Sequence, residues 1–148
     1  MDLDEALDWV AAHTHAVLIT LRRDGRAQSS DVSYAVEGPG SGDGDDRHLL
    51  ISITDDRAKT ANMRRDNRVV VHVTSPSTWS YVSMDGTVEL MPVASSPDDD
   101  TVEALVRYYE AVTGGPHPDW DEYRRAMVDD RRLIARFHPA SAVGQINR

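Results

Sequence analysis

A chain of 148 residues suits one domain and leaves little room for a second hydrophobic core. Its 16 basic and 25 acidic side chains give a net charge of −9, which argues against a nucleic-acid partner. Cysteine is absent, so disulfides and thiolate metal sites are excluded. The apolar runs fall far short of the about 20 residues that a membrane helix needs, and the acidic start lacks the basic region of a signal peptide. We therefore expect one cytoplasmic domain over residues 1–148, with neither nucleic acid nor membrane as partner.

The first 36 residues predict a helix followed by a β-hairpin. Asp2 or Asp4 caps a helix that ends near His13. Its apolar residues recur on one helical face: Leu3, Leu7, Val10 and Ala11. Residues 16–21 form a β-branched strand, and Arg-Asp-Gly at 23–25 is a turn signal. Alternating apolar residues then mark the return strand: Val32, Tyr34 and Val36.

A loop rich in glycine and aspartate over residues 37–46 leads to a third strand over 49–54. Asp55 and Asp56 then offer N-caps for a helix over 57–65.

Two further strands and a tight turn come next. Residues 69–73 are rich in valine and predict a strand, and Ser-Pro-Ser at 75–77 turns the chain. A second strand begins at Trp79 and continues to Leu90, with Gly86 as a bulge or bend.

The last third of the chain predicts two helices, over 98–112 and 119–129, and then two closing strands around Pro139, over 133–137 and 142–146. A chain of mostly antiparallel strands with one inserted helix and two late helices is typical of a small closed β-barrel with peripheral helices. The fold class is therefore mainly β.

The most informative motif is the start of the helix over 57–65. Arg57 and Lys59 lie in its first turn, where the helix dipole already supplies partial positive charge. An anion is needed there for balance, and either a bound ligand or the carboxylates of Asp55 and Asp56 can supply it. Lys59 is the only lysine in the chain, so a compact ammonium stands where every other basic residue is arginine.

The charge distribution indicates the same region. Residues 22–68 hold nine basic and nine acidic side chains, so the whole net charge of −9 arises elsewhere. These basic residues either surround an anionic ligand or form a solvated surface of arginine–aspartate pairs. The candidates are Arg22, Arg23, Arg26, Arg57, Lys59, Arg64, Arg65 and Arg68.

Other chemistries find little support. The six histidines lack the spacing of a metal site, so we expect no metal. His72, within a run of valines, is typical of a core or interface histidine. Trp79 and Tyr81, two apart on a predicted strand, point to the same side and either stack on a planar ligand or form a core or dimer contact.

Taken in order, five stretches resemble the flavin- and deazaflavin-binding split β-barrel family, the pyridoxine 5′-phosphate oxidase-like proteins. The stretches are residues 17–28, 56–66, 79–81, 97–105 and 119–127. The resemblance implies a six- to seven-stranded antiparallel split β-barrel with Greek-key topology and peripheral helices. It also implies a homodimer with the cofactor at the subunit interface.

On this resemblance Arg57 and Lys59 bind the cofactor phosphate, and Asn62 supports them. Gln28 and Ser52 approach the ring or ribityl chain. Trp79 and Tyr81 come from the second subunit. Asp31 departs from the family, whose members carry an amide there, and the loop over 37–48 is longer than usual.

The class that the chain resembles most uses coenzyme F-420, a deazaflavin, and includes biliverdin reductases. The resemblance implies hydride transfer to a conjugated small-molecule acceptor such as a quinone, an enone or a tetrapyrrole, and no catalytic residue is assigned. One alternative is an FMN-binding pyridoxamine or pyridoxine 5′-phosphate oxidase-like protein. Others are a flavin- or deazaflavin-binding protein without turnover, and a structural barrel without ligand.

Overall fold

The computed structural model describes residues 1–38 and 47–148 and contains four α-helices, one 3-10 turn and six strands. The elements are α1 (Leu3–Val10), β1 (His15–Leu21), β2 (Ala27–Glu37), β3 (His48–Thr54), α2 (Ala58–Arg65), β4 (Arg68–Ser75), η2 (Pro76–Thr78), β5 (Ser80–Leu90), α3 (Asp100–Thr113), α4 (Trp120–Asp129) and β6 (Arg132–Gln145). Of the predicted 37–46 loop, residues 39–46 lie outside the described residues, and Glu37 belongs to β2.

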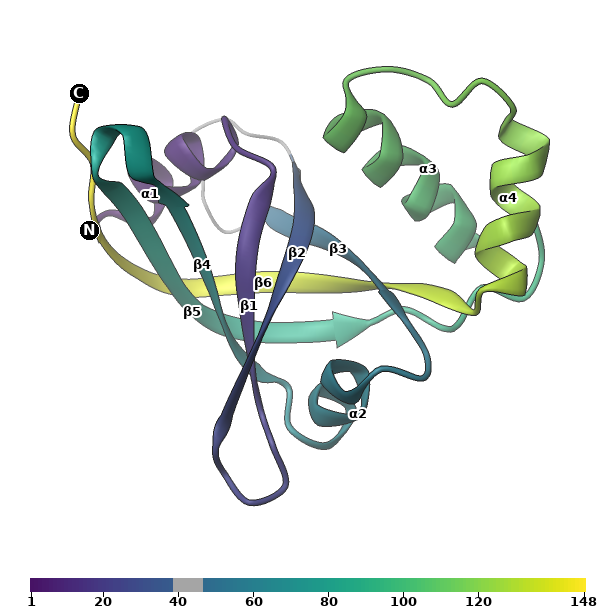
Figure 1. Cartoon of the computed structure of the whole chain (residues 1–148), viewed down its shortest axis with the longest axis horizontal. Coiled ribbons are helices and arrows are strands. Elements are labelled where there is room, and N and C mark those ends of the chain that lie inside the picture. The colour runs from purple at the N-terminus through teal and green to yellow at the C-terminus, as the bar shows by residue number, and fades with distance from the viewer. Residues whose placement is uncertain (39–46) are drawn as a thin grey trace.

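The six strands close into an antiparallel barrel in the order β1-β2-β3-β6-β5-β4, with β4 paired to β1 (Figure 1). Strands β4, β1, β2 and β3 follow one another across the sheet, which is the Greek-key arrangement. The predicted mainly β barrel with peripheral helices is confirmed. Alternate side chains of every strand fill its interior, among them Leu18, Tyr34, Ile51, Val71, Met84 and Phe137.

The two predicted closing strands are one strand, β6, which runs through Pro139. The register of β5 and β6 shifts between Asp85 and Gly86, so Asp85 pairs with Ser141 whereas Gly86 pairs with Pro139. Such a bulge accommodates a proline, which has no N–H for the ladder. The bulge predicted at Gly86 is confirmed, and a Cβ there would overlap the carbonyl oxygen of His138.

The barrel is split between β2 and β3. Their ladder ends at the Tyr34–Ile51 pair, although β2 continues alongside β1 back to Ala27, and β3 continues alongside β6 to Thr54. Helix α2 follows β3 directly and packs on β1 near this opening (Figure 1).

Helices α3 and α4 pack against each other and on the outer face of β3 and β6. A second hydrophobic cluster joins them to the barrel: Leu50, Ala104, Leu105, Tyr123 and Ile134. In the part of the chain that the structure describes, no helix is long and apolar enough to cross a lipid bilayer.

Candidate anion and cofactor site

Three basic side chains form a cation cluster beside the split: Arg57, which precedes α2, Lys59 of α2 and Arg132 of β6. Arg57 Nε donates to Thr54 Oγ1 at 3.2 Å, and Arg132 Nη1 donates to Ser52 Oγ at 3.3 Å. Lys59 makes neither a hydrogen bond nor an ion pair with the described residues. Burial lowers the pKa of Lys59, and the charges of Arg57 and Arg132 lower it further. Three positive charges therefore lie close together, and no carboxylate of the described residues forms an ion pair with them.

The expected caps of α2 were wrong, and the reason bears on this charge. Arg57 occupies the N-cap position, no side chain caps the helix, and α2 begins at Ala58. The Asp55 carboxylate instead binds Arg64 at 2.6 Å and Arg131 at 2.7 Å. Those contacts hold the pKa of Asp55 below its usual value. Asp55 therefore does not cap α2, and the first backbone N–H groups of this helix remain available to an anion.

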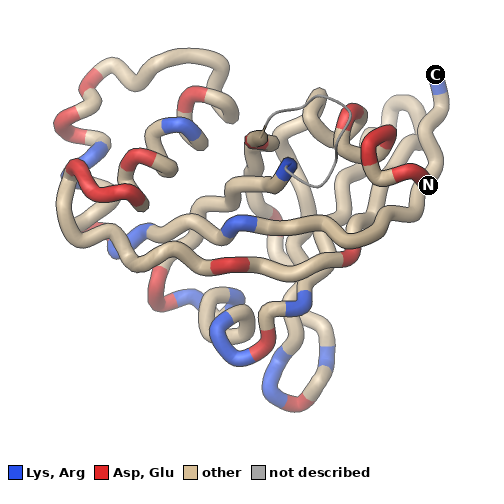
Figure 2. Tube along the Cα trace, turned by 180° about the vertical axis from the view of Figure 1, so that it is seen from behind, with Lys and Arg blue, Asp and Glu red and all other residues tan. Residues whose placement is uncertain are grey.

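Three of the other basic residues of this region pair with carboxylates, and Arg64, bound to Asp55, is one of them. Arg68 pairs with Asp66 at 2.8 Å, and Arg22 lies 3.7 Å from Asp24. Figure 2 shows basic residues gathered on α2 and on the β1–β2 hairpin, with acidic residues prominent on α1, α3 and α4. Arg65 is held by Asn62 and by the carbonyl oxygen of Leu21 instead of by a carboxylate. Arg23 and Arg26 make no ion pair with a described residue either, but they lie in the β1–β2 turn. Arg57 and Lys59 are the candidates that lie beside the split without an acidic partner among the described residues.

A polar wall adjoins the cation cluster. Ser52 of β3 and Arg132 of β6 meet on the outer face of the barrel. Tyr108 of α3, which packs on β2, lies near Ser33 and Arg132. Burial raises the pKa of Tyr108, although Ser33 and the Arg132 charge oppose the rise. Two buried polar atoms on strands beside the split, Ser30 Oγ and Arg132 Nε, lack a hydrogen-bond partner among the described residues. A polar ligand would satisfy atoms of this kind.

Gln28 and Asn62 lie together in a latch between α2 and the β1–β2 hairpin. The buried Asn62 Nδ2 donates to Thr20 Oγ1 at 3.1 Å and to Gln28 Oε1 at 3.0 Å. Arg65 donates to Asn62 Oδ1 at 2.9 Å and to the carbonyl oxygen of Leu21 at 3.0 Å. The latch thus fixes the helix that carries Lys59.

Trp79 and Tyr81 lie at the far end of β4 from α2, away from the cation cluster (Figure 1). Trp79 is not part of a strand: it follows η2 with a left-handed backbone, so strand alternation does not pair it with Tyr81. The Tyr81 ring stacks on His72, with ring centroids 5.6 Å apart. Within one chain, these aromatic residues do not reach Lys59.

Asp31, the departure from the family pattern, is paired rather than isolated. Its carboxylate lies 3.3 Å from His15 Nε2, and its side chain is largely exposed on the outer face of β2.

Comparison with known proteins gives the family. A family described as pyridoxamine 5'-phosphate oxidase matches residues 3–141. The chain belongs to the pyridoxamine 5'-phosphate oxidase family.

Solved structures share the fold at low identity. A conserved hypothetical protein of Mycobacterium tuberculosis has a TM-score of 0.74 at 22% identity, over 100% of this chain and 86% of that one. A protein named F-420 reductase has a TM-score of 0.60 at 22% identity, over 88% of this chain and 89% of that one. A FAD-binding protein of Mesorhizobium loti has a TM-score of 0.63 at 19% identity, over 97% of this chain and 92% of that one.

The residues of this pyridoxamine 5'-phosphate oxidase family member fit a phosphate-bearing flavin-type cofactor. Arg57 and Lys59 offer unneutralised charge for the phosphate, beside free N–H groups of α2. Arg132, Tyr108 and Ser33 offer donors for a polar ring system. Sequence reasoning missed these last three residues.

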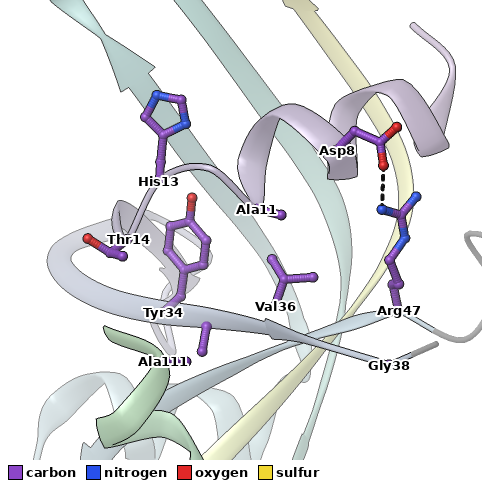
Figure 3. Close-up of a pocket in the computed structure, with 10 residues that line it drawn as sticks. Asp8, Ala11, His13, Thr14, Tyr34, Val36, Gly38, Arg47 and Ala111 are labelled. Carbon is purple, nitrogen blue, oxygen red and sulfur yellow. Dashed lines mark hydrogen bonds and ion pairs between the residues drawn. The ribbon is translucent and has the colours of Figure 1, made fainter. Parts of the chain in front are cut away.

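A separate hollow of about 390 Å³ lies between α1, β2 and α3 (Figure 3). Its lining includes the buried Arg47, which binds Asp8 of the same lining at 2.7 Å and Asp4 at 3.2 Å. The Tyr34 hydroxyl donates to the carbonyl oxygen of Val10 at 2.6 Å. Arg47 Nε has no hydrogen-bond partner among the described residues. The Arg47 charge, however, is balanced by Asp4 and Asp8, so the hollow fits an anionic cofactor less well than the split.

Proposed function

We propose that this protein is a homodimeric reductase that uses coenzyme F-420 and reduces a conjugated small molecule, such as a quinone, an enone or a tetrapyrrole. The observation that carries the proposal is the cation cluster of Arg57, Lys59 and Arg132, which lacks a carboxylate partner beside the split. The resemblance to the F-420-dependent class and a structural neighbour named F-420 reductase favour the deazaflavin.

The protein contributes binding and orientation, and the bound deazaflavin would supply hydride chemistry. Arg57 and Lys59 hold the phosphate by charge-assisted hydrogen bonds. The Asn62 latch keeps α2 in place before binding, so less ordering is needed when the ligand arrives. Tyr108 carries its proton at neutral pH as any tyrosine does, and burial raises its pKa further.

The dimer is supported by an outer face of β1, β4, β5 and β6. These side chains point away from the barrel interior. The main helix contacts do not involve β4 or β5, whereas α2 packs on β1, and α1, α3 and α4 pack on β6. The face includes Val17, Ile19, Val70, His72, Tyr81 and Val143. Val143 is 63% exposed and Trp79 85% exposed. Together with the neighbouring apolar side chains of this face they form an apolar surface that suits a protein–protein contact. A second copy would cover them and bring Trp79 and Tyr81 towards the partner's cofactor.

The second candidate is an FMN-binding oxidase-like protein. The cation cluster would serve the phosphate of FMN as well as that of F-420, and one structural neighbour is a FAD-binding protein. A non-catalytic flavin or deazaflavin carrier would use the same residues.

The test is oxidation of chemically reduced F-420 by the purified protein with a panel of quinones, enones and tetrapyrroles. We expect at least one acceptor to be reduced by wild type and by Arg64→Ala, and only weakly by Lys59→Ala. No turnover with any acceptor, despite saturable F-420 binding, would favour the carrier. Rapid re-oxidation by air of a bound yellow cofactor would favour FMN.

A further inference from the structure

The turn that carries Trp79 has an unusual backbone. Trp79 adopts φ 55° and ψ 36°, the left-handed region that bulky L-residues rarely enter. Its side chain is 85% exposed, so contacts with its own chain do not compensate for this conformation. Unfavourable backbone conformations of this kind cluster at functional sites.

Asn147, in the segment after β6, holds this turn through its side-chain amide nitrogen. Its Nδ2 donates to the carbonyl oxygens of Thr78 at 3.0 Å and Trp79 at 2.9 Å. Its Oδ1 accepts from Gln145 Nε2 at 3.2 Å, and its backbone N–H donates to Ser80 Oγ at 2.9 Å. One side chain therefore holds the carbonyl groups of the two peptide bonds that flank the Trp79 Cα.

We propose that Asn147 is a positioning residue that locks the turn after η2, so that the Trp79 indole is presented to a planar heteroaromatic ring bound by a second copy of the chain. The inference rests on the proposed dimeric, cofactor-binding function. A flat aromatic ring of this size offers stacking area on a conjugated ligand. Locking it before binding removes the ordering cost that a free turn would impose.

The chain offers matched variants. Asn147→Ala removes all side-chain contacts, and Asn147→Asp keeps the acceptor for Gln145 but loses both Nδ2 donations. Asn67→Ala is the control, because the Asn67 side chain is exposed and makes no hydrogen bond within the described ranges. Each variant is labelled with 5-fluorotryptophan and followed by fluorine NMR, with Trp79 assigned by its loss in Trp79→Phe.

We expect the Trp79 resonance of wild type to shift when F-420 or FMN saturates the protein. Both Asn147 variants should show a narrowed, averaged Trp79 resonance and a Kd for the cofactor raised about tenfold, the equivalent of lost hydrogen bonds. Their Tm should stay within about 2 °C of the Asn67→Ala control, because the contacts are exposed.

Unchanged cofactor affinity in both Asn147 variants would overturn the inference. So would a Trp79 resonance of wild type that does not shift when the cofactor saturates the protein. The second measurement needs Trp79→Phe for the assignment but no Asn147 substitution, so it decides even if the Asn147 variants unfold. If wild type binds neither cofactor, the proposed function fails instead, and this outcome is distinct from the first two.

Discussion

Replacing Lys59 by alanine removes the one ammonium of the cation cluster, and we expect it to weaken cofactor binding without harming the fold. Lys59 makes no hydrogen bond or ion pair to another described residue, and the charges of Arg57 and Arg132 act against its protonated form. Its removal therefore takes away a repulsion, and the melting temperature should be equal to or slightly above that of wild type.

The loss in binding follows from one charge-assisted hydrogen bond to phosphate. Such a bond contributes about 1.5–3 kcal/mol, which corresponds to a Kd raised about 10- to 150-fold. Arg64→Ala is the matched control, since Arg64 lies on the same helix but is paired with Asp55 at 2.6 Å. Its Kd should change by no more than about twofold.

Isothermal titration calorimetry of both variants, at one salt concentration, measures the difference. An unchanged Kd for Lys59→Ala would refute the anion site, and an equal loss in both variants would show that only overall charge matters. Unfolding of Lys59→Ala would show that the lysine is structural.

Three further changes test neighbouring parts of the account. Arg132→Ala should raise the cofactor Kd about tenfold and weaken its salt dependence; an unchanged titration would remove Arg132 from the site. Asn62→Ala should lower the free energy of unfolding in urea by about 1–3 kcal/mol, because it leaves buried polar groups unpaired; a smaller loss would mean that water replaces the latch. Arg68 holds the pKa of Asp66 at about 2, below the unfolded value of about 3.9. The Asp66 carboxylate therefore stabilises the folded protein at pH values above about 3.9, and this stabilisation is lost as the pH falls towards 2. In Asp66→Asn the Tm should therefore fall less between neutral and acidic pH than in wild type; an identical dependence of Tm on pH in both proteins would contradict this.

The barrel was predictable because local patterns dominate it. Alternating apolar residues in the strands and the Arg-Asp-Gly turn at 23–25 need no distant partner to be recognised. Pro139 misled the prediction of β6, because a proline usually ends a strand. Only the register with β5 shows that the bulge at Gly86 accommodates it.

The site was predictable where a rare residue type stands at a position that the neighbouring sequence defines. Lys59 is the single lysine and begins a helix directly after a strand. The role of Asp55 was not predictable, because its partner Arg131 is 76 residues away in the chain. The partners of Arg131 and Arg132 were not predictable either, because these two residues are adjacent in the chain yet bind Asp55 and Ser52, respectively. Sequence spacing does not reveal which of two neighbouring arginines faces the split.

The most direct test of the central claim is a fluorescence titration of the purified protein with coenzyme F-420 beside a matched titration with FMN. The account predicts saturable binding of F-420 with a micromolar or lower Kd, and weaker binding of FMN. Tighter binding of FMN would contradict the deazaflavin assignment while keeping the anion site. Binding of neither cofactor would contradict both.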